Sequence, residues 1–121
     1  MNINKTGVVA SVLLACLCML QAVQAESKIT IDSAWIREAP PATSVLAAYM
    51  TIKNDSETDQ QITGMESPDF KSAEIHRTVV EDGVAKMLPV SGLDIAAGDS
   101  ISLEPGGLHV MLFDPQRPLR E

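Results

Sequence analysis

The chain has 121 residues, 45% of them hydrophobic, and its 16 acidic side chains outnumber 9 basic ones, for a formal net charge of −7. Such an acidic chain is a poor partner for nucleic acid or anionic lipid, because both attract basic proteins. Its length allows one small domain with a limited hydrophobic core.

The first 25 residues have the pattern of an export signal. Lys5 precedes an apolar run of 14 residues, GVVASVLLACLCML, and small residues follow up to Ala25. Since a membrane-spanning helix needs about 20 apolar residues, we expect cleavage and no stable membrane anchor. A lipoprotein signal ending at Cys16 is the alternative. The predicted division is a signal peptide over residues 1–25 and one mature domain over residues 26–121.

Both cysteines, Cys16 and Cys18, lie inside the predicted signal. The mature domain would therefore have no thiol, which excludes disulfide bonds and cysteine chemistry. Because Lys5 is the only charged residue before Glu26, residues 26–121 have 16 acidic and 8 basic side chains, a formal charge of −8. This charge suits a basic protein partner or a cation, and it also suits simple solubility.

Short β-rich runs separated by turn residues extend from Lys28 onward. The breaks recur about every ten residues, which is typical of a β-sandwich or barrel, and no stretch has a convincing helical period. We therefore expect an all-β domain. Strands are predicted over residues 28–38 (as one bent strand or a pair), 45–54, 61–66, 71–80, about 101–104, and around His109, and loops over residues 40–44, 67–70 and 89–100.

The sequence HRTVVEDGVAKM, residues 76–87, predicts a β-hairpin. Asp-Gly between β-branched runs favours a two-residue type I′ turn. With Asp-Gly in the turn, Thr78 pairs with Met87, and His76 lies one step further on the same face. A three-residue loop without a bulge would instead put His76 and Met87 on opposite faces.

Each of the two histidines has a methionine beside it. His76 has Met87 across the hairpin, and Met111 follows His109 by two residues, so the latter pair shares one face of a strand. Thioether sulfur is a soft, neutral ligand that selects Cu(I), and imidazole also binds copper. The four residues are therefore a candidate Cu(I) site. Taken singly, each is a common core or surface residue, so a metal-free secreted β-sandwich interaction domain is the alternative.

The sequence offers little for catalysis. It has no cysteine after the predicted signal, no G-x-S-x-G nucleophile motif, and no pair of carboxylates that stands out among its scattered acidic residues. We therefore predict that the chain is not an enzyme.

The spacing of the four candidate ligands, H-x10-M-x21-H-x-M, resembles the motif of the periplasmic PCu(A)C copper chaperone family. Further stretches that are similar to this family are AWIREAPPATSVLAAYMTIKN (34–54), DGVAKMLPV (82–90), IAAGDSISLEPGGLHVML (95–112) and RPL (117–119). The resemblance thus covers nearly all of the predicted mature domain.

The resemblance implies a cupredoxin-like β-barrel or sandwich that binds Cu(I) through His76, Met87, His109 and Met111 in the periplasm. It further implies a metallochaperone that passes copper toward the dinuclear copper centre of cytochrome c oxidase, with a Sco-type thiol protein as a second partner. A copper storage or resistance protein would use the same ligands and stays an alternative.

Family members usually continue past RPL with further β-strands, whereas this sequence ends at Glu121. A β-fold that ended there would leave an unpaired edge. We therefore expect the chain to lack its C-terminal strands.

Overall fold

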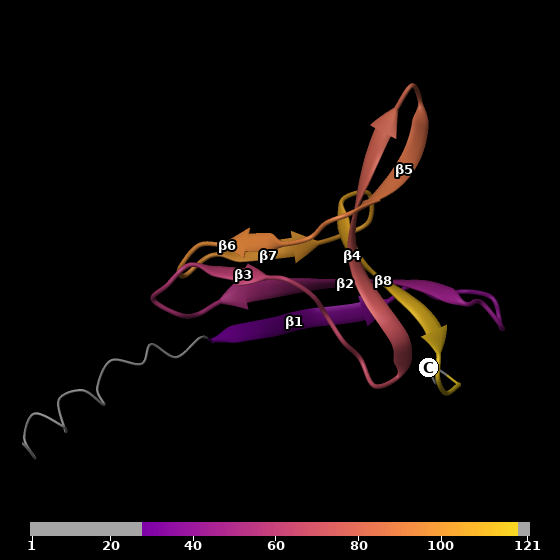
Figure 1. Cartoon of the computed structure of the whole chain (residues 1–121), viewed down its shortest axis with the longest axis horizontal. Coiled ribbons are helices and arrows are strands. Elements are labelled where there is room, and N and C mark those ends of the chain that lie inside the picture. Colours follow the sequence, from indigo (N-terminus) through magenta and orange to yellow (C-terminus); the bar gives the residue numbers. More distant parts are fainter. Residues whose placement is uncertain (1–27, 119–121) are drawn as a thin grey trace, which may run out of the picture.

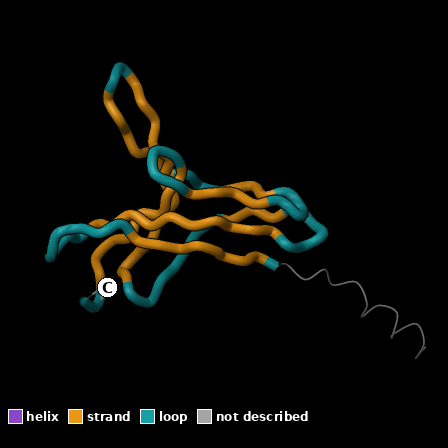
Figure 2. The backbone as a smooth tube through the Cα atoms, turned by 180° about the vertical axis from the view of Figure 1, so that it is seen from behind, coloured by secondary structure: helices purple, strands orange, loops and turns teal. Residues whose placement is uncertain are grey.

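The computed structural model describes residues 28–118, and within that range it contains strands and no helix (Figures 1 and 2). This confirms the predicted all-β class. The predicted signal peptide lies outside the described residues. Over residues 28–118 we find no helix with the length and apolar character needed to cross a membrane. The strands, in chain order, are β1 (Ile29–Ile36), β2 (Val45–Asn54), β3 (Gln60–Ile62), β4 (Phe70–Glu81), β5 (Val84–Pro89), β6 (Leu93–Ile95), β7 (Ser100–Leu103) and β8 (Leu108–Pro115).

Six strands form one antiparallel sheet in the order β1-β2-β8-β4-β5, and β7 also pairs with β2. β8 lies beside the first half of β2 and β7 beside its second half, so both share one edge of β2. β3 and β6 form a second, two-stranded sheet. The last described strand, β8, is paired on both sides, because it lies between β2 and β4; β1 and β5 stand at the two ends of the strand order, and β7 pairs with β2 alone.

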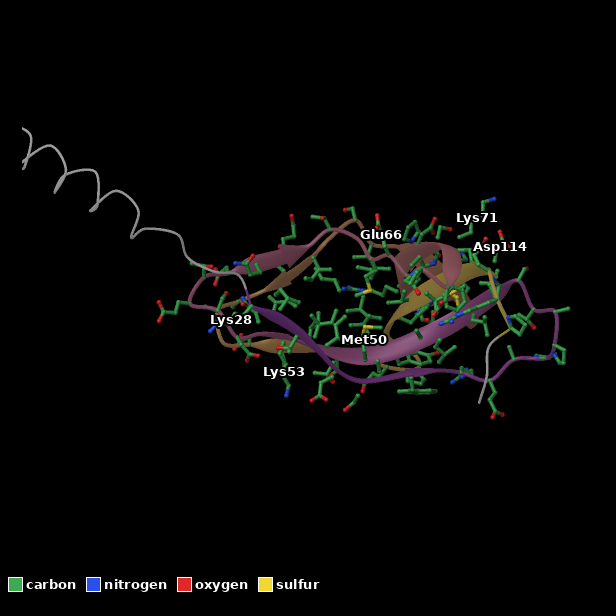
Figure 3. All side chains as sticks on the ribbon, turned by 90° about the horizontal axis from the view of Figure 1, so that it is seen from below. Lys28, Met50, Lys53, Glu66, Lys71 and Asp114 are labelled. Carbon is green, nitrogen blue, oxygen red and sulfur yellow. The ribbon has the colours of Figure 1, made fainter. Side chains whose placement is uncertain are left out.

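The core lies on one face of the large sheet, where strand alternation places the branched side chains. Ile52 of β2 and Val110 of β8 are almost fully buried there, and Ile95 of the small sheet packs into the same cluster. Met50 of β2 and Met65 pack against this cluster, and Figure 3 shows Met50 pointing into the interior. Two of the four methionines of the predicted mature domain therefore pack against the core.

A buried asparagine joins the two sheets at the end of β2. Asn54 is fully buried, and its side-chain nitrogen donates to the carbonyl oxygens of Thr58 (2.8 Å) and Ile95 (2.9 Å). Its side-chain oxygen accepts from the backbone and the hydroxyl of Ser56. Because both polar atoms of this amide have partners, its desolvation on burial is compensated. The hydrogen bond to Ile95 then holds β6 against β2.

Most of the predicted strands are confirmed, and two local predictions are wrong. β1 is one strand with an irregularity between Asp32 and Trp35, as expected for a bent strand. The strand expected over residues 61–66 ends at Ile62, because Gly64 favours no extended pairing and Met65 makes only an isolated bridge. β6 lies within the predicted loop over residues 89–100, since three residues are too few to show a strand period.

The β4–β5 hairpin extends away from the rest of the molecule in both views (Figures 1 and 2). All residues of β5 are exposed. Asp82 and Gly83 both have positive φ angles, of 50° and 75°, which confirms the predicted type I′ turn. The register also matches the prediction, because Thr78 pairs with Met87.

Candidate metal centre

The two histidines lie directly opposite each other on neighbouring strands. His76 of β4 pairs with His109 of β8 in antiparallel register. Residues paired in this way project to the same face of the sheet. The two imidazole ring centroids are 6.0 Å apart, with the planes inclined at 53°. The sheet register thus brings together two rings that are far apart in the sequence.

Met111 lies on the same face of β8 as His109, because Val110 between them points into the core. Its partner on β4 is Glu74, two residues before His76. Met111 is partly buried. Three of the four predicted ligands, His76, His109 and Met111, therefore occupy one patch of the β4–β8 pair on the face opposite the core.

Met87 comes from the protruding hairpin. Thr78 pairs with Met87 and His76 pairs with Pro89, so Met87 is a diagonal neighbour of His76 on the same face. Its side chain is 54% exposed. Met87 therefore lies at the solvent side of the patch, whereas His109, which is 2% exposed, lies at its floor.

Each imidazole uses one nitrogen in a hydrogen bond within the chain. His109 Nδ1 donates to the carbonyl oxygen of Gly107 (3.2 Å), and His76 Nε2 donates to a carboxylate oxygen of Glu74 (2.9 Å). A carbonyl and an ionised carboxylate only accept hydrogen bonds, which places the ring protons on these two nitrogens. The remaining nitrogens, Nε2 of His109 and Nδ1 of His76, then have free lone pairs.

These two free nitrogens are buried and have no hydrogen-bond partner among residues 28–118. A buried polar atom without a partner typically costs about 1–3 kcal/mol of stability. A metal ion or another electrophilic ligand at this point would remove that cost. The unpartnered nitrogens of His76 and His109 thus make this patch the candidate binding site.

An aromatic pair borders the patch on the side of His109. The buried ring of Tyr49 lies 6.4 Å from the His109 ring and 4.6 Å from the ring of Trp35, measured between centroids. The guanidinium of Arg37 lies over the Tyr49 ring at 5.7 Å. Packing on Tyr49 limits the motion of the His109 ring and so helps to fix the position of Nε2.

The donor types at the patch restrict which metals it suits. No group of three or more His, Cys, Asp or Glu side chains able to hold a metal occurs in the part of the chain that the structure describes. Zinc sites in proteins usually have three or four such ligands, and Ca²⁺ and Mg²⁺ require oxygen. The neighbouring thioethers of Met87 and Met111 would complete the two imidazoles as a donor set that suits a soft monovalent ion, whereas the Glu74 carboxylate already accepts a hydrogen bond from His76.

Sequence reasoning missed Glu74, Gly107 and the aromatic pair of Trp35 and Tyr49. A signal for Glu74 was present, because it precedes His76 by two residues and strand alternation puts both on one face. The positions of the two aromatic residues follow from the pairing of β1 with β2, where Trp35 lies opposite Tyr49. Such pairing between strands leaves no local trace in the sequence.

A family model described as "Putative lipoprotein LpqE-like" matches residues 29–121. "Putative lipoprotein Lxx21020" of Leifsonia xyli subsp. xyli is 32% identical over 92 residues, which cover 75% of this chain and 54% of that protein. "Uncharacterized protein RP573" of Rickettsia prowazekii is 29% identical over 119 residues, which cover 95% of this chain and 66% of that protein. The chain thus spans between half and two thirds of the length of these curated relatives.

Two solved structures are similar to this chain in fold. The copper-bound PCuAC domain from PmoF2 has a TM-score of 0.61 and 22% sequence identity, covering 80% of this chain and 74% of that one. The apo PmoF2 PCuAC domain has a TM-score of 0.59 and 23% identity, covering 80% and 73%. The chain therefore has the β-fold of PCuAC domains, which confirms the fold expected from the sequence motif.

Proposed function

The chain belongs to the LpqE-like family, and from this premise we propose that it is an exported Cu(I)-binding carrier whose ligands are His76, Met87, His109 and Met111. One observation carries the proposal: two buried imidazole nitrogens without partners in the described residues share a face with two methionines that the core does not use. Four neutral ligands of this kind stabilise Cu(I) and bind it without a reactive thiol. The PCuAC domain from PmoF2, which has the same fold, is copper-bound, and this supports the choice of metal.

The exposure of Met87 favours carriage of copper over catalysis or permanent storage. A carrier must let a partner protein approach its metal and replace its ligands one at a time. Met87 is 54% exposed and belongs to a hairpin strand whose residues are all exposed, so it is the ligand most easily displaced. His109 at the buried end would release the ion last. We infer a non-enzymatic role on this basis.

The location and the partners form the finer part of the proposal. We infer that residues 1–25 direct export and that the protein acts in the periplasm, which the description of the family as lipoproteins supports. Processing at Cys16 would instead attach the domain to lipid. As recipient we propose the dinuclear copper centre of cytochrome c oxidase, with a Sco-type thiol protein as a second partner. Storage or resistance differs from this proposal only in having no recipient.

The test is an anaerobic Cu(I) titration of the exported protein against a coloured chelator. We expect one ion per chain, with weaker binding in the His109→Ala and Met111→Leu variants. Met65→Leu is the matched control, since it removes a thioether that packs against the core. Circular dichroism and thermal unfolding verify that each variant is folded. Absence of competition by the folded wild-type chain would overturn the proposal in favour of a metal-free interaction domain.

Transfer of the bound ion distinguishes the carrier from a storage protein. Cu(I)-loaded protein is mixed with the copper-free, soluble copper domain of an oxidase, and the distribution of copper is measured after separation. Movement of copper to the oxidase domain supports the carrier. A control without the chain verifies that the oxidase domain binds free Cu(I) at the same concentration. Retention of copper on the chain under these conditions supports storage.

A further inference from the structure

Glu74 differs from the other acidic side chains that form ion pairs in the described part of the chain. Asp32, Glu81 and Asp69 each pair with a lysine or an arginine. Glu74 instead accepts a hydrogen bond from Nε2 of His76 at 2.9 Å. Its carboxylate is 56% exposed, whereas the His76 side chain is 14% exposed. The carboxylate thus lies at the outer side of a ring whose other nitrogen is buried.

We propose that Glu74 is a positioning residue of the metal site, and that its hydrogen bond makes Nδ1 of His76 the nitrogen that binds copper. The inference rests on the proposed function, because it concerns the same site. Metal-binding histidines usually donate their second ring N–H to a carboxylate or a carbonyl, which fixes the tautomer and the ring orientation. Glu74 does this for His76, and the carbonyl of Gly107 does it for His109.

The two histidines then bind through different nitrogens. His76 has its free lone pair on Nδ1, and His109 has its free lone pair on Nε2. Without Glu74, the His76 ring has no partner that holds its proton on Nε2, and rotation about the Cβ–Cγ bond or a change of tautomer becomes possible. Part of the binding energy would then be spent on selecting the correct ring state.

Glu74 also brings a negative charge close to a site whose four proposed ligands are all neutral. With four neutral ligands, a Cu(I) ion keeps its full positive charge, and a carboxylate one hydrogen bond away attracts it. The charge and the hydrogen bond are separable. Glu74→Gln removes the charge but keeps an acceptor oxygen, whereas Glu74→Ala removes both. Positioning through the hydrogen bond predicts that the glutamine variant recovers most of the affinity that the alanine variant loses.

The matched control lies on the same strand. Glu81 is 58% exposed and pairs with Lys86 at the far end of the hairpin. Glu81→Ala therefore removes an equally exposed carboxylate from β4 without affecting His76. We expect Glu74→Ala to weaken Cu(I) binding by about 10- to 100-fold, the usual cost of losing such a partner, and Glu81→Ala to leave binding unchanged.

The decisive readout is ¹⁵N NMR of the histidine side chains in the full protein, recorded before and after addition of Cu(I), which is diamagnetic. In the copper-free wild type we expect a protonated Nε2 on His76 and a protonated Nδ1 on His109. Addition of Cu(I) should shift Nδ1 of His76 and Nε2 of His109. In Glu74→Ala, the copper-free His76 signals should change toward a mixture of tautomers, while those of His109 stay in place.

The possible failures are distinguishable. If the wild type does not bind Cu(I), the proposed function fails, whereas the effect of Glu74 on the His76 tautomer is still measured in the copper-free protein. If Cu(I) binds but Glu74→Ala has wild-type affinity and unchanged His76 signals, the positioning role is overturned. Binding of Cu(I) by Nε2 of His76 would overturn it as well. So would an equal loss of Cu(I) affinity in Glu74→Gln and Glu74→Ala.

Discussion

His76 and His109 face each other across the β4–β8 pair, with their ring centroids 6.0 Å apart, and each leaves one buried nitrogen without a partner in the described residues. The free atoms are different, Nδ1 in one ring and Nε2 in the other. A fold that buries two such atoms without partners loses stability until a ligand satisfies them.

Cu(I) binding should therefore raise the stability of the folded chain. A ligand that binds only the folded state at a free concentration 100 times its Kd adds about 2.7 kcal/mol to the free energy of unfolding. We expect an increase of this size in anaerobic thermal unfolding with buffered Cu(I). His109→Ala should abolish most of it. An equal increase in that variant would show that copper binds elsewhere on the chain.

The site should prefer Cu(I) to Zn²⁺ by a wide margin. Thioethers are poor ligands for zinc, and the two imidazoles alone leave half of its tetrahedral coordination unfilled. Native mass spectrometry with the two ions at equal free concentration checks this expectation. Zn²⁺ bound at a stoichiometry of one, in place of Cu(I), would contradict the proposed ligand set.

Met87 should contribute to affinity and almost nothing to stability. Because its side chain is 54% exposed, Met87→Leu should change the free energy of unfolding by less than about 0.5 kcal/mol. Cu(I) affinity should fall, and transfer to a chelator should become faster. The chain offers a close control in Leu88, which lies next to Met87 on the opposite face of β5 and is 46% exposed.

Exchange of the two side chains, in the double variant Met87→Leu and Leu88→Met, preserves the composition of the hairpin. We expect this double variant to bind copper as weakly as Met87→Leu alone, because its thioether points away from His76. Recovery of wild-type affinity would mean that the face of β5 is irrelevant, and Met87 would lose its place in the ligand set.

Local patterns in the sequence were enough to predict β2, the β4–β5 hairpin and its register. Alternating side chains define β2, and the Asp-Gly turn fixes which residues of β4 and β5 lie opposite each other. The strand β6 was missed, because Leu93–Ile95 is too short to show a period and is defined by its pairing with β3. Whether such a short segment forms a strand depends on its pairing with a part of the chain that is distant in sequence.

The same distinction applies to the site. The sequence placed Met111 beside His109 and Met87 beside His76, since each pair is close along the chain or across one turn. It did not indicate that β4 pairs with β8, which sets His76 opposite His109. The choice of ring nitrogen depends on Glu74 and Gly107 and on their distances, which a residue pattern does not contain.

The turn of the hairpin gives the last prediction. Gly83 has a φ of +75°, and a Cβ added there would meet no atom within 4 Å, so a substitution acts through backbone strain alone. Gly83→Val should cost about 1–2 kcal/mol locally. Because the residues of β5 are all exposed, we expect the strain to be relieved by opening of the hairpin while the core stays folded.

Amide hydrogen exchange measures this opening directly. In Gly83→Val the amides of β5 should exchange faster, and Cu(I) affinity should fall because Met87 is no longer held beside His76. Addition of copper should restore protection in β5, since binding links the two strands. Gly64→Val is the control, because Gly64 also has free space around a Cβ but lacks a positive φ. Wild-type copper affinity in a Gly83→Val chain with an unprotected β5 would show that Met87 is not a ligand.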